Sequence, residues 1–135
     1  MVEEVVVMKE VLTKEMIDAG CEFLQRLDEG NLNIQAALWV YLWESNRWRL
    51  FFALPEVQKK GSLKIYQKIH AVLSQIPDDQ SSVYWNDISV TGTDDRLISM
   101  LRKRKPAVPL MTRVYVPGRI LYGHYVEEAY IYRLK

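Results

Sequence analysis

The stretch ALWVYLWESNRWRLFFALPEV, residues 37–57, constrains the fold most because it is apolar on both of its alternating sets of positions. Residues 36–43 and 48–54 are rich in aromatic and β-branched side chains with a period of two, which is typical of β-strands. The polar tetrapeptide Glu44–Arg47 lies between these two runs. Together they predict a β-hairpin with its turn at Ser45–Asn46.

Pairing across this turn assigns the large side chains to two faces of the hairpin. With Ser45–Asn46 as a two-residue loop, the opposed pairs on one face are Trp43–Trp48, Tyr41–Leu50 and Trp39–Phe52. The other face then carries Leu38, Val40, Leu42, Phe51 and Ala53. Because neither face is polar, we expect the hairpin to be central in a sheet and covered on both sides.

Three segments are expected to be helices, and the first two have apolar residues at helical spacing. The first is expected to begin after the cap residue Thr13 and to close at Gly30 in left-handed geometry. Gly20 lies on its apolar stripe, which favours a close approach of this helix to a sheet. The other two expected helices run from a hydroxyl cap to a proline, from Ser62 to Pro77 and from Thr93 to Pro106.

The remaining periodic segments predict strands. Residues 84–90 form one, residues 110–125 form a hairpin turning at Pro117–Gly118, and residues 127–134 form the last. Val5–Met8 is a further candidate edge strand. We therefore expect one α+β domain over residues 1–135, with a mainly antiparallel sheet of about five to six strands and three helices packed on it.

Composition narrows the class of protein. The 135 residues carry a net charge of +1, so no bulk field favours nucleic acid or membrane. The first 60 residues hold 7 basic and 10 acidic side chains, and the remainder 11 and 7. Cys21 is the one cysteine, and neither a signal peptide nor an apolar run of membrane-spanning length is evident. We expect a soluble cytoplasmic protein that does not bind membranes.

No residue pattern predicts catalysis or metal binding. Cys21 has no histidine near it in sequence, and His70 and His124 lack the spacing of metal ligands. The carboxylate pairs Asp78–Asp79 and Asp94–Asp95 are typical of a turn and of a helix start. We therefore assign no catalytic, cofactor-binding or metal-binding residue, and we expect folding without cofactor or metal.

The aromatic face of the hairpin is the best candidate for a functional surface, because three helices are few for covering two apolar sheet faces. We expect a non-enzymatic domain that self-associates as a homodimer, or binds another protein, through this face. The candidate surface residues are Trp39, Tyr41, Trp43, Trp48, Arg47 and Arg49.

Two other classes of function stay open. Arg47, Arg49 and Arg113, with the RKRK cluster at residues 102–105, favour a nucleic-acid-binding module that stacks bases on aromatic rings. A hydrolase or nuclease with an unrecognised carboxylate site is the second alternative.

Several stretches resemble a family of small prokaryotic proteins of uncharacterised function. They are TKEMIDAG at 13–20, the hairpin sequence at 37–57, KIYQKI at 64–69, DISV at 87–90 and EEAYIYRL at 127–134. The resemblance spans most of the chain. It implies no activity, cofactor or site residue for this sequence.

Overall fold

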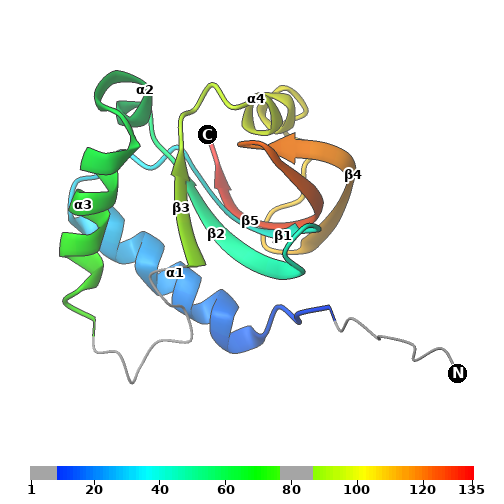
Figure 1. The fold of residues 1–135 in the computed structure, drawn as a ribbon, viewed down its shortest axis with the longest axis horizontal. Helices are drawn as coiled ribbons and strands as arrows, with labels where there is room; N and C mark the ends of the chain where they lie inside the picture. Colours follow the sequence, from blue (N-terminus) through cyan, green and yellow to red (C-terminus); the bar gives the residue numbers. More distant parts are fainter. Residues whose placement is uncertain (1–8, 77–86) are drawn as a thin grey trace, which may run out of the picture.

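The computed structural model describes residues 9–76 and 87–135 as a curled sheet with helices on both of its faces (Figure 1). The helices are α1 (Lys14–Glu29), α2 (Glu56–Lys60), α3 (Ser62–Leu73) and α4 (Arg96–Lys103). The strands are β1 (Ala36–Leu42), β2 (Arg47–Ala53), β3 (Ile88–Thr91), β4 (Arg113–Leu121) and β5 (His124–Leu134). The α+β class predicted from the sequence is confirmed.

The five strands form one sheet in the order β3-β2-β1-β5-β4. Three of the four neighbouring pairs are antiparallel, and β2 pairs with β3 in parallel. The sheet is therefore mixed. The parallel pair arises because the chain between β2 and β3 includes α2 and α3, a crossover long enough to bring β3 back in the same direction.

Strand β1 is buried on both faces, and it separates two apolar cores. One core contains Trp39, Tyr41 and the buried side chains of α1 and α3. The other contains Leu38, Val40 and the buried side chains of α4 and the inner face of β4–β5. The expectation of a central hairpin covered on both sides is confirmed, and Figure 1 shows α1 and α4 on opposite sides of the sheet.

The hairpin register differs from the prediction by two residues. Its connection contains the four residues Trp43–Asn46, and the observed pairs are Tyr41–Trp48, Trp39–Leu50 and Ala37–Phe52. Asn46 adopts φ 53° and accepts a 2.6 Å hydrogen bond from the Tyr41 hydroxyl, which holds the longer turn. Because a shift of two preserves side-chain alternation, the predicted faces within β1 and β2 are correct. Trp43 is the exception, because it lies beyond the end of β1.

The predicted helix ends need correction. Gly30 has φ −79°, so it is not left-handed; Asn31, the next residue, has φ 61°. Thr13 caps α1 as predicted, since its hydroxyl accepts from the N–H of Met16. Gly61, rather than Ser62, precedes α3, and Pro77 lies outside the described residues. The short helix α2 brings the described helices to four instead of the expected three.

Helix α4 begins after Asp95 rather than after Thr93. One Asp95 carboxylate oxygen accepts from the N–H groups of Leu97 and Ile98 at 2.9 and 3.3 Å. The Thr93 hydroxyl instead donates to Gln58 at 2.9 Å. A carboxylate at the helix start also interacts favourably with the helix dipole, which explains the preference for Asp95.

Pro117 and Gly118 do not form the predicted turn, because β4 runs through them. The β4–β5 turn lies at Tyr122–Gly123, where both residues have positive φ. An edge strand tolerates proline, and the pairing with β5 is irregular between Tyr115 and Arg119. Strand β3 matches part of the predicted strand 84–90, whereas Val5–Met8 and residues 84–86 lie outside the described residues.

The predicted close approach of α1 to the sheet at Gly20 is confirmed. A Cβ added there would lie 2.8 Å from the Trp39 indole nitrogen and would clash with the Tyr132 hydroxyl. The indole N–H donates to that hydroxyl at 2.9 Å, and the hydroxyl donates to the carbonyl of Ile17 in α1. Burial raises the pKa of Tyr132, so the hydroxyl stays protonated and serves as a donor at neutral pH.

Gly20→Ala is expected to destabilise the fold by up to about 2 kcal/mol, after allowing for the roughly 1 kcal/mol that Ala gains over Gly in a helix. Tyr132→Phe should cost about 1–3 kcal/mol because it leaves the Trp39 indole N–H unpaired in the core. The double variant should lose less than the sum of the two, since removal of the Tyr132 hydroxyl gives the new methyl group room. Urea unfolding measures all three, and additive losses would contradict this packing.

Candidate interaction surface

Three of the four aromatic residues predicted for the surface are interior. Trp39, Tyr41 and Trp48 are 0, 2 and 1% exposed and belong to the core that α1 and α3 cover. The expectation that they form an exposed face is therefore wrong. The physical reason is that residues 9–12, which precede α1, cover the aromatic side chains together with the helices.

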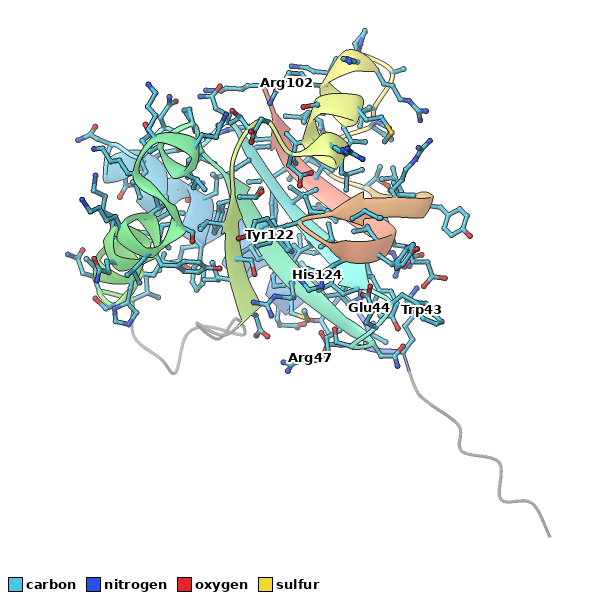
Figure 2. All side chains as sticks on the ribbon, turned by 45° about the horizontal axis from the view of Figure 1, so that its top comes forward. Trp43, Glu44, Arg47, Arg102, Tyr122 and His124 are labelled. Carbon is cyan, nitrogen blue, oxygen red and sulfur yellow. The ribbon has the colours of Figure 1, made fainter. Side chains whose placement is uncertain are left out.

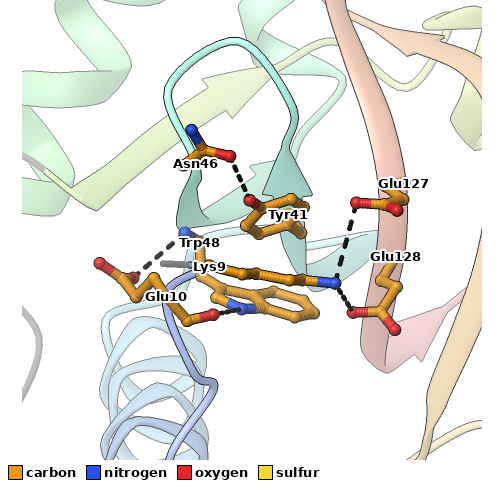
Figure 3. Close-up of polar contacts among 7 residues, drawn as sticks. All are labelled: Lys9, Glu10, Tyr41, Asn46, Trp48, Glu127 and Glu128. Atoms are coloured by element: carbon orange, nitrogen blue, oxygen red, sulfur yellow. Dashed lines mark hydrogen bonds and ion pairs between the residues drawn. The ribbon is translucent and has the colours of Figure 1, made fainter. Parts of the chain in front are cut away.

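Residues 9–12 cover the end of the hairpin that α1 does not reach (Figure 3). Glu10 accepts from the Trp48 backbone N–H at 3.1 Å with its carboxylate and from the Trp48 indole N–H at 3.0 Å with its carbonyl. The Lys9 ammonium lies 4.3 Å from the Tyr41 ring centroid and 2.7 Å from a Glu128 carboxylate oxygen. Leu12 is buried in the same core. This segment thus completes the burial of both aromatic rings.

The two arginines predicted for the surface are held against neighbouring strands and loops. Arg47 lies 3.0 Å from Asp87 and 3.7 Å from Glu10 in ion pairs. Arg49 donates to the Ile88 carbonyl at 3.5 Å. Its Nε is buried without a hydrogen-bond partner in the part of the chain that the structure describes. Neither arginine lies over an exposed ring that could stack a base, since the neighbouring Trp48 is buried.

Trp43 is the one predicted aromatic residue that is exposed, at 65%. Figure 2 shows it with Glu44 at the turn end of the hairpin, at the opposite end of the sheet from Arg102. The Trp43 N–H donates to the Tyr125 carbonyl at 3.1 Å, which places Trp43 next to β5. The exposed surface therefore continues from the hairpin turn onto β5.

Four exposed side chains form what we call the outer patch: Trp43, Tyr115, Ile120 and Tyr125. Ile120 and Tyr125 are opposite each other on β4 and β5, and Tyr115 is opposite Glu128. Glu128 is in turn opposite the buried Tyr41 of β1. Register thus places Tyr115, Ile120 and Tyr125 on the α1-side sheet face, and Trp43 adjoins them at the β1–β2 turn.

Sequence reasoning missed three of these residues. The alternation of Tyr115 with Val114 and Val116 predicts that the tyrosine lies on the opposite face of the strand from the two valines. In the structure both valines lie on the α4 side. Nothing in the alternation tells which face of β4 a helix covers. The predicted turn at Pro117–Gly118 also concealed the pairing of Ile120 with Tyr125.

Charges of both signs border the outer patch. Glu44 accepts the Tyr125 N–H at 2.8 Å, and this hydrogen bond lowers the pKa of its carboxyl group, so it is ionised at neutral pH. Arg113 is exposed on the same face of β4, opposite Tyr130. No hydrogen bond or ion pair joins the Arg113 side chain to another described residue.

The residues considered for catalysis or metal binding take part in packing and helix capping instead. Cys21 packs against the α1-side core, and Asp95 caps α4 while its second oxygen accepts the Tyr122 N–H. Within residues 9–76 and 87–135, no group of three His, Cys, Asp or Glu side chains is arranged to hold a metal ion. Asp78–Asp79 lies outside the described residues.

Comparisons with protein-family models, curated proteins and solved structures gave no significant match to this chain. The resemblance to a prokaryotic family and the cytoplasmic location therefore stay predictions. None of the helices in the described ranges has the length and apolar content that a membrane span needs.

Glu10→Ala is expected to reduce the free energy of unfolding by about 1–3 kcal/mol, because the buried N–H of Trp48 loses its acceptor. Glu10→Gln keeps an acceptor oxygen and should cost less than about 1 kcal/mol, since the exposed ion pair to Arg47 contributes little. Urea unfolding followed by tryptophan fluorescence compares the two. Equal losses would show that the charge, rather than the hydrogen bond, stabilises this segment.

Proposed function

We propose that this chain is a non-enzymatic interaction domain that self-associates through the outer patch. The observation that carries the proposal is the presence of four large side chains, each at least 48% exposed, on the β4–β5 hairpin and at the adjoining β1–β2 turn. Single exposed apolar residues are normal on a soluble protein, whereas a contiguous aromatic patch marks an interaction site. Tyrosine and tryptophan are also the side chains that most often dominate binding energy.

The border charges support a second copy of the chain as the partner. Arg113 lies toward one end of the patch, and Glu44 lies at the hairpin end. A two-fold axis through the patch brings the basic end of one copy toward the acidic end of the other. Symmetric contacts need only one self-complementary surface, and they are the commonest form of homo-oligomer. The dimer expected from the sequence is retained here with a different surface.

Contact between patch faces is favoured over pairing of the β4 edges. Pro117 has no N–H to donate, and the β4 pairing is irregular between Tyr115 and Arg119. A long regular ladder between two β4 strands is therefore disfavoured. The outer patch offers side-chain burial that does not depend on the free edge.

Trp43→Glu should give a folded protein with a dimer dissociation constant raised at least about thirtyfold, the effect of a loss of about 2 kcal/mol at an aromatic residue that dominates binding. Because Trp43 is largely exposed, its replacement should leave the cores intact. Light scattering coupled to size-exclusion chromatography, over a concentration series, measures the association. Circular dichroism checks the fold.

Leu63→Glu is the matched control, because Leu63 is 71% exposed on α3 and lies outside the patch. It adds the same charge and should leave the dimer unchanged. A wild-type protein that remains monomeric at high micromolar concentration would overturn the proposal. So would equal weakening by the two glutamate variants, since the patch then has no special part in association.

The nucleic-acid alternative has less support from the geometry. Arg47 and Arg49 lie on β2, whereas the 102–105 cluster begins in the last turn of α4 and ends just after it, so they do not form one continuous platform. Arg102 is also occupied, donating to the carbonyls of Lys135 and Thr93 at 2.8 and 3.1 Å. For the hydrolase alternative, no described feature adds support.

A further inference from the structure

A second surface, on the α4 side of the sheet, has a different chemistry. Residues 96–126 contain seven Lys and Arg side chains and not one Asp or Glu, and only Arg113 among the seven is placed on the α1-side face. They form α4, the connection after it, β4, and the start of β5. This part of the chain therefore concentrates positive charge that the nearly neutral total conceals.

A cavity of about 570 Å³ lies within this region, between α4, residues 104–109 and β4. That volume is in the range of about 300–1,000 Å³ typical of small-molecule sites. Its apolar lining comes from Met100, Leu101, Ala107, Val108, Pro109, Val114 and Val116. The cavity is thus suited to an apolar body of modest size.

Two guanidinium groups complete the lining, Arg104 from the end of α4 and Arg119 from β4. Register places Arg119 opposite Val126, whose side chain belongs to the α4-side core. Among the described residues, the guanidinium groups of Arg104 and Arg119 have no hydrogen-bond or ion-pair partner. The lining includes no acidic side chain, so the positive charge of the cavity is uncompensated.

We propose that this cavity binds a small amphipathic anion, with one carboxylate or phosphate head on an apolar body. The two guanidinium groups, contributed by different elements, are available to hold the head by charge-assisted hydrogen bonds. The body packs on the apolar lining and displaces water from it. The two guanidinium groups lie outside the outer patch, and Tyr115 is the one residue that belongs both to the cavity lining and to that patch.

A nucleic acid strand is a poorer match for the same cavity. Strand binding uses a stripe of cations with aromatic platforms for successive bases. Here two cations lie over an apolar floor, and Tyr115 is the one aromatic residue of the lining. Because Tyr115 also belongs to the outer patch, none of the variants that test the cavity replaces Tyr115.

The test titrates four probes into the full-length protein: octanoate, octyl phosphate, octanol and inorganic phosphate. Isothermal titration calorimetry gives the affinity, and backbone amide chemical shifts locate the site. Octanoate or octyl phosphate should bind and shift the amides of residues 100–119. Octanol and inorganic phosphate, which each lack one half of the ligand, should bind at least about tenfold more weakly. The tighter of the two anions identifies the head group.

Three variants and one control assign the contacts. Arg104→Gln and Arg119→Gln should each weaken binding of the anion at least about tenfold while leaving octanol binding unchanged, because each removes one charged donor. Ala107→Trp should weaken both, because it fills the cavity. Lys103→Gln, one residue before Arg104 and outside the cavity lining, is the matched control and should change nothing.

Several outcomes would overturn the site. One is equal affinity for octanoate and octanol, which would show that the arginines do not contribute to binding. Another is an equal effect of Lys103→Gln and Arg104→Gln, which would indicate attraction by the whole basic region. A third is tight, steeply salt-dependent binding of a short oligothymidylate that shifts the same amides, with no binding of either amphipathic anion.

Discussion

The burial of β1 on both faces is the constraint on which the rest of the structure depends. A strand that pairs on both edges and carries apolar side chains on both faces needs two separate layers of cover. Here α1 and α3 supply one layer, and α4 with the curled β4–β5 hairpin supplies the other. Because the sheet curls, the inner faces of β4 and β5 pack with α4 and with one face of β1 in a single core.

The α1-side layer is tight near the middle of the sheet and incomplete at its end. Gly20 lets α1 approach closely enough for the Trp39 indole, the Tyr132 hydroxyl and the Ile17 carbonyl to form one buried chain of hydrogen bonds. Toward the hairpin turn, Lys9 and Glu10 replace the helix as cover. The polar atoms of the buried Trp and Tyr side chains therefore find hydrogen-bond partners, so burial of these rings leaves few donors unsatisfied.

Beyond that cover, the two faces of the β4–β5 hairpin acquire different chemical characters. The α1-side face presents the outer patch, which is aromatic and bordered by Glu44 and Arg113. The α4-side face borders a cavity with an apolar lining and two unpaired guanidinium groups. One edge hairpin thus offers a surface suited to a second copy of the chain and a cavity suited to a small anion. Neither surface uses the buried tryptophans that dominate the sequence pattern.

The sequence by itself determined the α+β class, the central hairpin, the faces of β1 and β2, and the close approach at Gly20. Each of these follows from local periodicity or from the size of a side chain. Only the tertiary structure decided that Trp39, Tyr41 and Trp48 are core while Trp43, Tyr115, Ile120 and Tyr125 are exposed. It also decided that β4 continues through Pro117, and that Arg104 and Arg119 share a cavity. The physical reason is that alternation assigns a side chain to a face, whereas exposure depends on which distant segment packs over that face.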